Sequence, residues 1–557
     1  MRTTLLVFIL GFSLKVTAQS AYIPISDYYN HMIERYEIKG KNFNSNLHTS
    51  FKPVSRASVA SLIDSLRYDL TNVDEENIEY LKADNWEFFA GAAESDKLLM
   101  NKFYSRKPDF ISVDNPDFQL HASPVLYFGV GRDPNSGSTP IINSRGFEIR
   151  GQIDSKLTFY TFLTENQAVF PSYVQNRILD DGVIPNQGFW KRFGTNGVDY
   201  FDARGYIQLN ASKHISIQMG HDKNFIGNGY RSLLLSDYSS SYPFLKIQTK
   251  VWKFQYTNLF AELIADINGN NGGTFGVGEF PKKFMTLHHL SINLAKNFNL
   301  GVFEAVIFHR GDSTGSAFEL NYLNPIIFYT AVEQQSGSPD NALFGIDFKW
   351  NVKAGISFYG QAMLDELIVS ELKAGNGWWG NKFAWQLGGK YIDAFNISQL
   401  DLQVEYNYAR PFTYTHESIF TSYTNYRQPL AHPLGNNFKE TILIGRYQPI
   451  QKLTLTGKLI MAKSGKEDPN GTNLGTNVLR SYNDQRDSDY GHTTGQGIAT
   501  DLKLIQVSAS YMFKHNLFID LSHTYRNFTS ADAALNQTTQ YTAIAVRLNV
   551  GKKDFGY

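Results

Sequence analysis

Hydrophobic residues recur along this chain with two different periods, and the change from one to the other divides it into two parts. Between about residues 22 and 90 the period is helical. One set of apolar residues stands at positions i, i+3, i+4 and i+7: Tyr29, Met32, Ile33 and Tyr36. The same spacing recurs at Val59, Leu62, Ile63 and Leu66. With the segment "DEENIEYLKADNWEF", these patterns predict three short amphipathic helices that pack as a small bundle.

From about residue 117 onward the period becomes two. In "FEIRGQID", Phe147 and Ile149 alternate with Glu148 and Arg150. Successive side chains of a strand point to opposite faces, so such a segment has one apolar and one polar face. The same alternation marks "DYFDARGYIQLN", "DLQVEYNYAR" and "TAIAVRLNVG". Many of these segments run to about 11–14 residues, whereas globular strands average about 5–6 and a membrane-spanning strand needs about 9–11.

Short and long connections between the strands alternate along the chain. Short turns are predicted at 154–156, 210–213, 249–252, 295–299, 350–353, 393–398, 449–452 and 513–516. Long polar connections are predicted at 131–142, 168–196, 222–242, 266–283, 311–341, 367–380, 411–437, 465–499 and 529–539. This rhythm is typical of outer-membrane barrels, which have short periplasmic turns and longer outer loops. It predicts an all-β transmembrane barrel of about 18 antiparallel strands, with the helical bundle on the periplasmic side.

The first residues have the pattern of an export signal. Arg2 supplies the positive charge, "LLVFILGFSL" is the apolar core, and Val16-Thr17-Ala18 is a small-residue cleavage site. We therefore expect a signal peptide at 1–18, a periplasmic helical bundle or plug with its linker at 19–115, and an outer-membrane β-barrel at 116–557. The localisation that follows is the bacterial outer membrane.

Composition narrows the class of protein further. The chain has no cysteine, which excludes disulfides and thiolate metal sites. Its 52 Lys and Arg balance 52 Asp and Glu, so it lacks the basic excess that nucleic-acid binding requires. Neither an HExxH nor a GxSxG motif is present, and the histidines lack metal-ligand spacing. We therefore expect no catalysis, no cofactor, no metal and no nucleic-acid partner, and an outer-membrane enzyme is the least supported class.

The polar faces of the predicted strands carry ionisable groups of both signs. The residues predicted to face the lumen are Glu148, Arg150, Asp202, Arg204, Asp365, Lys382, Glu405, Asp520 and Arg547. A barrel of this size keeps an aqueous lumen unless something fills it. The charges are interpreted as a solvated or salt-bridged wall, and the alternative is a transport channel for a small solute.

The stretch "GHDKNFIGNGYRSLLLSDYSSSYP" (220–243) begins like a phosphate-binding loop. It lacks the lysine that such a loop places after its last glycine, and it lies between antiparallel strands. Gly227 and Gly229 are instead predicted to supply positive φ angles for a sharp turn. That turn would fold the connection inward, with Leu233–Leu235 packed beneath it.

Two blocks of the sequence resemble the Wzi-type capsule-assembly outer-membrane proteins. The first block is "IGNG" (226–229) and "LLLSDYS" (233–239), followed by Pro243, with Ile226 and Asn228 in place of the family's tryptophan and proline. The second is "LNPIIFYTAVEQQSGSPDNALFGIDFKW" (323–350). The residues that match the family motifs are Gly227, Gly229, Ser236, Asn341, Gly345, Asp347 and Trp350.

This resemblance implies an eighteen-stranded barrel, closed below by helices and above by loops, that attaches exported polysaccharide to the cell surface. The cleavage region and the Tyr-, Phe- and Asn-rich composition are also similar to the Bacteroidota branch, which includes gliding-motility proteins of the RemB type. Expected partners are surface polysaccharide, outer-membrane lipid and other envelope or gliding-machinery proteins. The residues predicted to bind ligand, all placed in outer loops, are Asn228, Tyr230, Arg231, Asp237, Trp378 and Trp379. For the two tryptophans, a place in the interfacial aromatic belt is the alternative.

Overall fold

The computed structural model describes residues 21–95, 99, 102–154, 156–265, 280–310, 318–328, 340–467 and 471–557. The predicted signal peptide at 1–18 lies outside these residues, as does 329–339 within the second family block.

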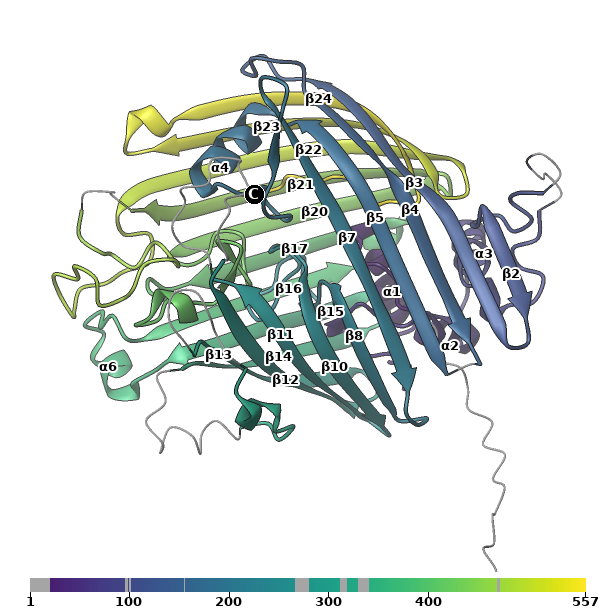
Figure 1. The fold of residues 1–557 in the computed structure, drawn as a ribbon, viewed down its shortest axis with the longest axis horizontal. Helices are drawn as coiled ribbons and strands as arrows, with labels where there is room; N and C mark the ends of the chain where they lie inside the picture. Colours follow the sequence, from purple (N-terminus) through teal and green to yellow (C-terminus); the bar gives the residue numbers. More distant parts are fainter. Residues whose placement is uncertain are drawn as a thin grey trace, which may run out of the picture.

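In the described residues, eighteen long antiparallel strands close into a barrel, as predicted (Figure 1). The strands are β3 (Phe118–Arg132), β4 (Ile141–Ile153), β5 (Leu157–Val169), β7 (Gly197–Asn210), β8 (Ile215–Asp222), β10 (Tyr242–Val251), β11 (Phe254–Ile264), β12 (Lys282–Ala295), β13 (Phe298–Phe308), β14 (Asn341–Lys353), β15 (Ile356–Glu366), β16 (Lys382–Tyr391), β17 (Leu400–Ala409), β20 (Phe438–Ile450), β21 (Leu453–Lys466), β22 (Ile498–Lys514), β23 (Leu517–Ser530) and β24 (Gln537–Leu548). The barrel closes where β24 pairs with β3, with Ile544 opposite Val130.

The connections follow the predicted alternation. The eight predicted short turns join successive strands at one end, called here the turn end, and the described parts of the long connections lie at the opposite, loop end. Among the described residues, two of the long connections carry α-helices, α4 (Ser172–Asp181) and α6 (Val369–Ala374), which Figure 1 shows at the loop end. The alternation of faces also holds, because Phe201 and Ile544 are exposed on the outer wall while Asp202 and Arg547 are buried within.

Three helices close the turn end: α1 (Asp27–Lys39), α2 (Arg56–Ser65) and α3 (Asn72–Asp84). The side chain of Ser26 caps the first, and Thr71 and Asp74 form a capping box on the third. Their apolar stripes meet in one core, which includes Met32, Ile33, Tyr36, Val59, Leu62, Ile63, Ile78 and Leu81. A short 3-10 helix, η1 (Trp86–Phe88), follows. Among the described residues, no helix is both long enough and apolar enough to cross a membrane.

Short strands join these parts. In the lumen, β1 (Phe51–Lys52) from the bundle pairs with β9 (Phe225–Ile226). At the turn end β2 (Ile111–Asn115) extends the barrel wall beside β3, and at the loop end β6 (Lys191–Phe193) pairs with β7. β18 (Thr424–Asn425) and β19 (Gln428–Pro429) form a small hairpin between β17 and β20.

The chain beyond β24 enters the lumen, which the sequence pattern did not predict. "TAIAVRLNVG" suggested a strand through Val550, but β24 ends at Leu548. Residues 549–557, called here the tail, start at the turn end, where the Asn549 side chain donates to the Pro124 carbonyl at 2.9 Å. They reach the loop end, where the Tyr173 hydroxyl of α4 donates to the Phe555 carbonyl at 3.2 Å. Figure 1 accordingly places the C-terminus beside α4.

Candidate functional site

The connection of residues 223–241 folds into the barrel as predicted, but its two glycines act differently. Gly227 has φ +136°, which confirms the predicted turn, and a Cβ there would lie 2.5 Å from Nε2 of Gln361. Gly229 does not adopt a positive φ. It is required by close approach, because a Cβ would lie 2.5 Å from Oε2 of Glu405. The prediction of positive φ at Gly229 is therefore wrong.

The leucine run beneath this turn is fully buried. Leu233, Leu234 and Leu235 have no exposed surface, and the hydroxyls of Tyr414 and Tyr423 donate to the Leu233 and Leu234 carbonyls at 2.7 and 2.8 Å. Paired carbonyls remove the cost of burying this irregular backbone inside the barrel. The run therefore forms a packed layer across the lumen.

Four of the family-motif residues support this layer or the wall around it. A Cβ on Gly345 would lie 2.5 Å from Cδ2 of Leu234, so the glycine leaves room for the leucine. The Ser236 hydroxyl donates to the Ala431 carbonyl. The Asn341 amide donates to the Thr421 carbonyl at 2.9 Å, and Asp347 bonds Nε2 of His289 at 2.7 Å. A fifth, Trp350, points outward and is exposed on the wall near the turn end.

Three residues predicted to bind ligand in an outer loop lie inside the barrel. Asn228 is 3% exposed; its side chain accepts from Thr49 at 2.9 Å and its carbonyl accepts from Lys390 at 2.8 Å. The outer location predicted for Asn228, Tyr230 and Arg231 is wrong, because the connection folds inward to bury its leucines. Asp237 is half-buried in the same connection and borders the lumen cavity.

Tyr230 and Arg231 instead hold the tail. The Arg231 guanidinium donates to the Gly556 carbonyl and lies 3.4 Å from Glu440. The Tyr230 hydroxyl donates to Asp554 at 3.2 Å. Glu405 fixes their backbone by accepting both of their N–H groups, at 2.6 and 3.0 Å. These contacts join the inward connection, the tail and strand β17.

The structure places the other lumen-facing charges on the inner wall, mostly as ion pairs. Asp202 pairs with Arg204 at 3.0 Å, Asp365 with Lys382 at 3.0 Å, and Asp520 with Arg547 at 2.7 Å. Arg150 pairs with Glu87 of η1 at 2.6 Å. Glu148 borders the lumen cavity. Most of these charges thus pair with one another along the inner wall, and Arg150 binds η1 of the segment that closes the turn end.

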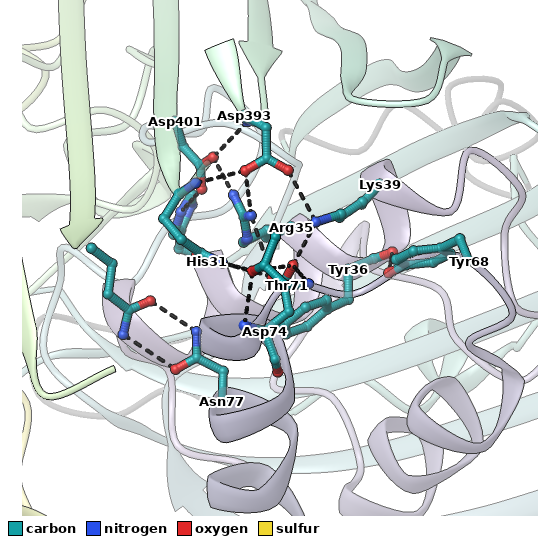
Figure 2. A network of polar contacts seen from close by, with 12 residues as sticks. His31, Arg35, Tyr36, Lys39, Tyr68, Thr71, Asp74, Asn77, Asp393 and Asp401 are labelled. Atoms are coloured by element: carbon teal, nitrogen blue, oxygen red, sulfur yellow. Dashed lines mark hydrogen bonds and ion pairs between the residues drawn. The ribbon is translucent and has the colours of Figure 1, made fainter. Parts of the chain in front are cut away.

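The largest of these networks fastens the helical bundle to the turn end, and the sequence reasoning missed it (Figure 2). Arg35 of α1 donates to Asp401 of β17, to Asp393 at 2.6 Å and to Asp74 of α3 at 3.3 Å. Lys39, one helical turn further on, also pairs with Asp74 and lies 3.0 Å from Asp393. Arg35 and Lys39 lie four residues apart, and so on one face, in the amphipathic helix α1, but nothing in the sequence indicates which carboxylates they meet.

This network sets the protonation of Asp74. Burial raises the pKa of its carboxyl, but the hydrogen bond from Lys39, the charge of Arg35 and the Thr71 N–H together lower the pKa to about 2. The carboxylate therefore stays ionised at neutral pH. Beside it, the amides of Asn77 and Gln448 exchange hydrogen bonds at 2.8 and 3.2 Å, which adds a link from the bundle to the wall, here between α3 and β20 (Figure 2).

A cavity of about 560 Å³ remains between the bundle, the inward connection and the tail. It is lined by tyrosines and by charges of both signs, including Arg204, Asp222, Lys223, Tyr230, Arg446 and Lys553. Burial lowers the pKa of Lys223 to about 8, and its ammonium donates to the Asn186 carbonyl at 2.6 Å. The cavity could hold water or a small polar solute. The described residues contain no group of three or more His, Asp or Glu that could hold a metal ion.

At the loop end, the remaining two predicted ligand residues belong to a cluster of aromatic side chains. Trp378 and Trp379 follow α6 and are both half-buried. The Trp379 ring lies 4.9 Å from the Tyr482 ring, and the Arg486 guanidinium lies 3.9 Å over its face. Tyr490, in the same connection as Arg486, is 51% exposed. We call these residues the outer aromatic cluster: Trp378, Trp379, Tyr482, Arg486 and Tyr490.

Backbone hydrogen bonds between two long connections hold this cluster in place. The N–H groups of Trp379, Gly491 and His492 donate to carbonyls of Asp489, Asn376 and Gly377, all at 2.9 Å. A Cβ on Gly377 would lie 2.8 Å from the His492 nitrogen, so the backbones are in direct contact. Fixed aromatic faces beside polar groups can stack on and hydrogen-bond a flat, hydroxylated ligand. The partners of the tryptophans were missed because aromatic residues occur throughout this chain.

Comparisons with known proteins identify relatives of this architecture. The family model described as capsule assembly protein Wzi matches residues 139–543. The solved structure of Wzi from Escherichia coli, described as an outer-membrane, carbohydrate-binding β-barrel involved in group 1 capsule assembly, matches with 13% identity and a TM-score of 0.58. That match covers 96% of this chain and 100% of that chain, and it shows a shared fold.

Porin structures match less well. OprD from Pseudomonas aeruginosa matches with 11% identity over 78% of this chain and 96% of that chain, with a TM-score of 0.43. OccAB1 from Acinetobacter baumannii matches with 9% identity over 77% and 96%, with a TM-score of 0.42. No curated protein sequence matches this chain.

Proposed function

Because the chain belongs to the capsule assembly protein Wzi family, we propose that this outer-membrane barrel binds surface polysaccharide through its outer aromatic cluster. The observation that carries the proposal is the cluster itself, in which Trp379 and its neighbours are fixed by two connections at the loop end. The E. coli structure with the same fold is described as carbohydrate-binding. Binding, without catalysis, is the function that these contacts support best.

The geometry of the cluster suits a long polysaccharide. Tyr490 is exposed on the segment whose backbone hydrogen-bonds the tryptophan connection, so aromatic surface is available without rearrangement of the loops. Asp489, Asn376 and Ser488 provide hydrogen-bonding groups next to the rings. Since the cluster is ordered before binding, little conformational entropy would be lost when a chain of sugars docks across it.

The binding test uses purified full-length protein in detergent and the organism's own surface polysaccharide, with biolayer interferometry as the readout. Tyr490→Ala and Trp379→Ala are expected to weaken binding by about 2 kcal/mol, or roughly 30-fold. Trp252→Ala is the matched control, because this tryptophan is exposed at the turn end. Wild-type protein that does not bind, or equal binding by all three variants, would overturn the proposal.

We further propose that the bound polysaccharide is retained on the cell and supports gliding, as the RemB-type resemblance suggests. The test is a deletion strain, in which polysaccharide retained on cells is compared with polysaccharide shed into the medium, and colony spreading is scored on the same plates. Shedding with normal total synthesis supports retention. If colony spreading is lost while polysaccharide retention is unchanged, retention is not the role, and a motility-specific role takes its place.

A transport channel is the second candidate, favoured by the cavity of about 560 Å³ in the lumen, which charged residues of both signs help to line. It requires a continuous passage, whereas the bundle, the inward connection and the tail all occupy the barrel. Planar-bilayer recordings of the full-length protein distinguish the two functions. Stable unitary currents would favour transport, and their absence would leave polysaccharide binding as the function.

A further inference from the structure

A segment between β13 and β14 lies against the outer wall of the barrel. This segment, residues 318–328, is called here the strap and contains the 3-10 helix η2 (Leu320–Leu323). Its Tyr322 carbonyl accepts from the Thr286 hydroxyl at 3.1 Å, and the Tyr322 ring stacks on Phe308 at 4.2 Å. Met285 and Leu287 of the same strand belong to the interior core, so Thr286 points outward. The strap therefore covers the membrane-facing side of β12 and β13.

The wall beneath the strap carries polar groups. His288 bonds the Asn258 side chain at 2.7 Å, and Glu304 accepts the Phe328 N–H at 2.6 Å. The Tyr256 hydroxyl donates to the Pro325 carbonyl. Groups of this kind are costly against hydrocarbon unless they are paired, and the strap supplies several of the partners.

The strap in turn presents apolar side chains to the membrane. Leu320 is 76% exposed and Ile326 is 61% exposed, with Leu323 and Phe328 also exposed. The strap thus replaces a polar stretch of wall with an apolar ridge that stands above the barrel surface.

Beside this ridge runs an apolar groove of about 760 Å³. Its floor is a row of outward side chains that are neighbours across four strands, from Ile207 through Met219 and Leu245 to Phe260. Its lining includes Phe159 on one side and Phe284, Phe318 and Leu323 on the strap side. The volume lies within the range of about 300–1,000 Å³ that is usual for small-molecule sites.

A charged pair borders the end of the groove that is nearest the loop end. Glu262, which borders it, pairs with Lys282 at 2.8 Å, and both side chains are partly exposed. An ammonium has three donors, so Lys282 can hold Glu262 and an anionic group together. At the loop end of an outer-membrane barrel this position corresponds to the outer leaflet.

We propose that this groove is a lipid-binding site that holds an acyl chain of an outer-leaflet lipid, with the phosphate of the lipid meeting Lys282. The groove is continuous with the lipid-facing wall, so hydrocarbon already surrounds it. An acyl chain also matches its lining of aliphatic and aromatic side chains. The ridge would bury the acyl chain on a second side. The bound lipid would therefore be held more tightly than by the wall alone, because each buried methylene adds to the binding free energy.

The test counts lipids retained by the full-length protein. Purified protein in mild detergent is loaded with phosphatidylglycerol, exchanged repeatedly into fresh detergent, and examined by native mass spectrometry. Ile207→Trp fills the groove. Ile544→Trp places the same side chain at an exposed position of the wall on β24, which contributes nothing to the groove, and serves as the matched control. Heat-modified mobility on gels checks that each barrel is assembled.

We expect one phosphatidylglycerol retained by wild type and by Ile544→Trp, and about tenfold less by Ile207→Trp. Lys282→Gln should lower retention of phosphatidylglycerol but not of diacylglycerol with the same chains. No retained lipid in wild type, equal retention in Ile207→Trp, or a retained polypeptide would overturn the site. Equal loss of both lipids in Lys282→Gln would overturn the phosphate contact. Polysaccharide binding is measured separately, so failure of either proposal is recognised on its own.

Discussion

Removing Arg35 should release the helical bundle from the barrel. The guanidinium is 3% exposed and contacts three carboxylates, those of Asp401, Asp393 and Asp74. In Arg35→Met these groups lose their shared cation, and breaking a buried ion pair typically costs about 3–5 kcal/mol. Asp74 keeps Lys39 and Asp401 keeps His31 at 2.9 Å, so the lower end of the range applies. About 3 kcal/mol corresponds to a more than 100-fold shift toward the undocked bundle.

Thermolysin digestion of the folded protein in detergent measures this shift, because cleavage tracks the population of the open form when opening is fast. The protease does not recognise arginine, so the substitution removes no cleavage site. Lys82→Met is the matched control, since Lys82 and Glu79 form an exposed pair at 2.8 Å that is worth less than about 1 kcal/mol. Arg35→Lys should be intermediate, because it keeps the charge without the planar fork.

Similar cleavage of the bundle in Arg35→Met and Lys82→Met would refute this reasoning. It would mean that apolar packing against the barrel, rather than the ion-pair network, holds the bundle in place. A barrel that fails to assemble is recognised separately by its gel mobility.

Three further outcomes follow from particular contacts. The pKa of the Asp74 carboxyl is about 2 in the folded protein, below its usual value of 3.8, so its ionised form stabilises the fold. This stabilisation is complete above about pH 4 and is lost as the pH falls toward 2. Digestion with an acid-stable protease such as pepsin should therefore show release of the bundle over this pH range. Gly345→Ala should destabilise the protein by about 1–3 kcal/mol, because the added Cβ clashes with Leu234. In thermal unfolding, the effects of Gly345→Ala and Leu234→Ala should not add in the double variant. Strictly additive effects would contradict the contact. The chain has no cysteine, so a single introduced cysteine can be labelled selectively with a maleimide. Tyr490→Cys should react at least about tenfold faster than Tyr557→Cys, because the Tyr557 side chain is 8% exposed and lies in the lumen. Equal rates would show that the tail does not lie inside the barrel.

The architecture could be predicted because its signals are local. A membrane-spanning strand must alternate in polarity, and this alternation is visible within single segments such as "FEIRGQID". A barrel must also join its strands by turns, and these are visible as short polar stretches between the segments. The helices of the bundle were equally legible from their spacing and caps. The inward turn at Gly227 and the buried leucines beneath it were also anticipated.

The candidate site was predicted only in part. Trp378 and Trp379 lie where the sequence suggested, but Tyr482 and Arg486 join them from a connection about 100 residues away. Asn228, Tyr230 and Arg231 were placed outside and lie inside. For a polar residue next to an apolar run, the local sequence does not distinguish exposure to solvent from exposure to a charged lumen.

The sequence by itself determined the class of fold, the approximate strand number, the two ends of the barrel and which face of each strand is apolar, because each of these depends on periodicity within a short segment. Only the tertiary structure decided what fills the lumen, which charges pair, where the tail runs and how the strap covers the outer wall. Those features depend on which residues meet across hundreds of positions, as Arg35 meets Asp401 and Arg231 meets Gly556. Such contacts arise when the barrel closes, and no local pattern encodes them.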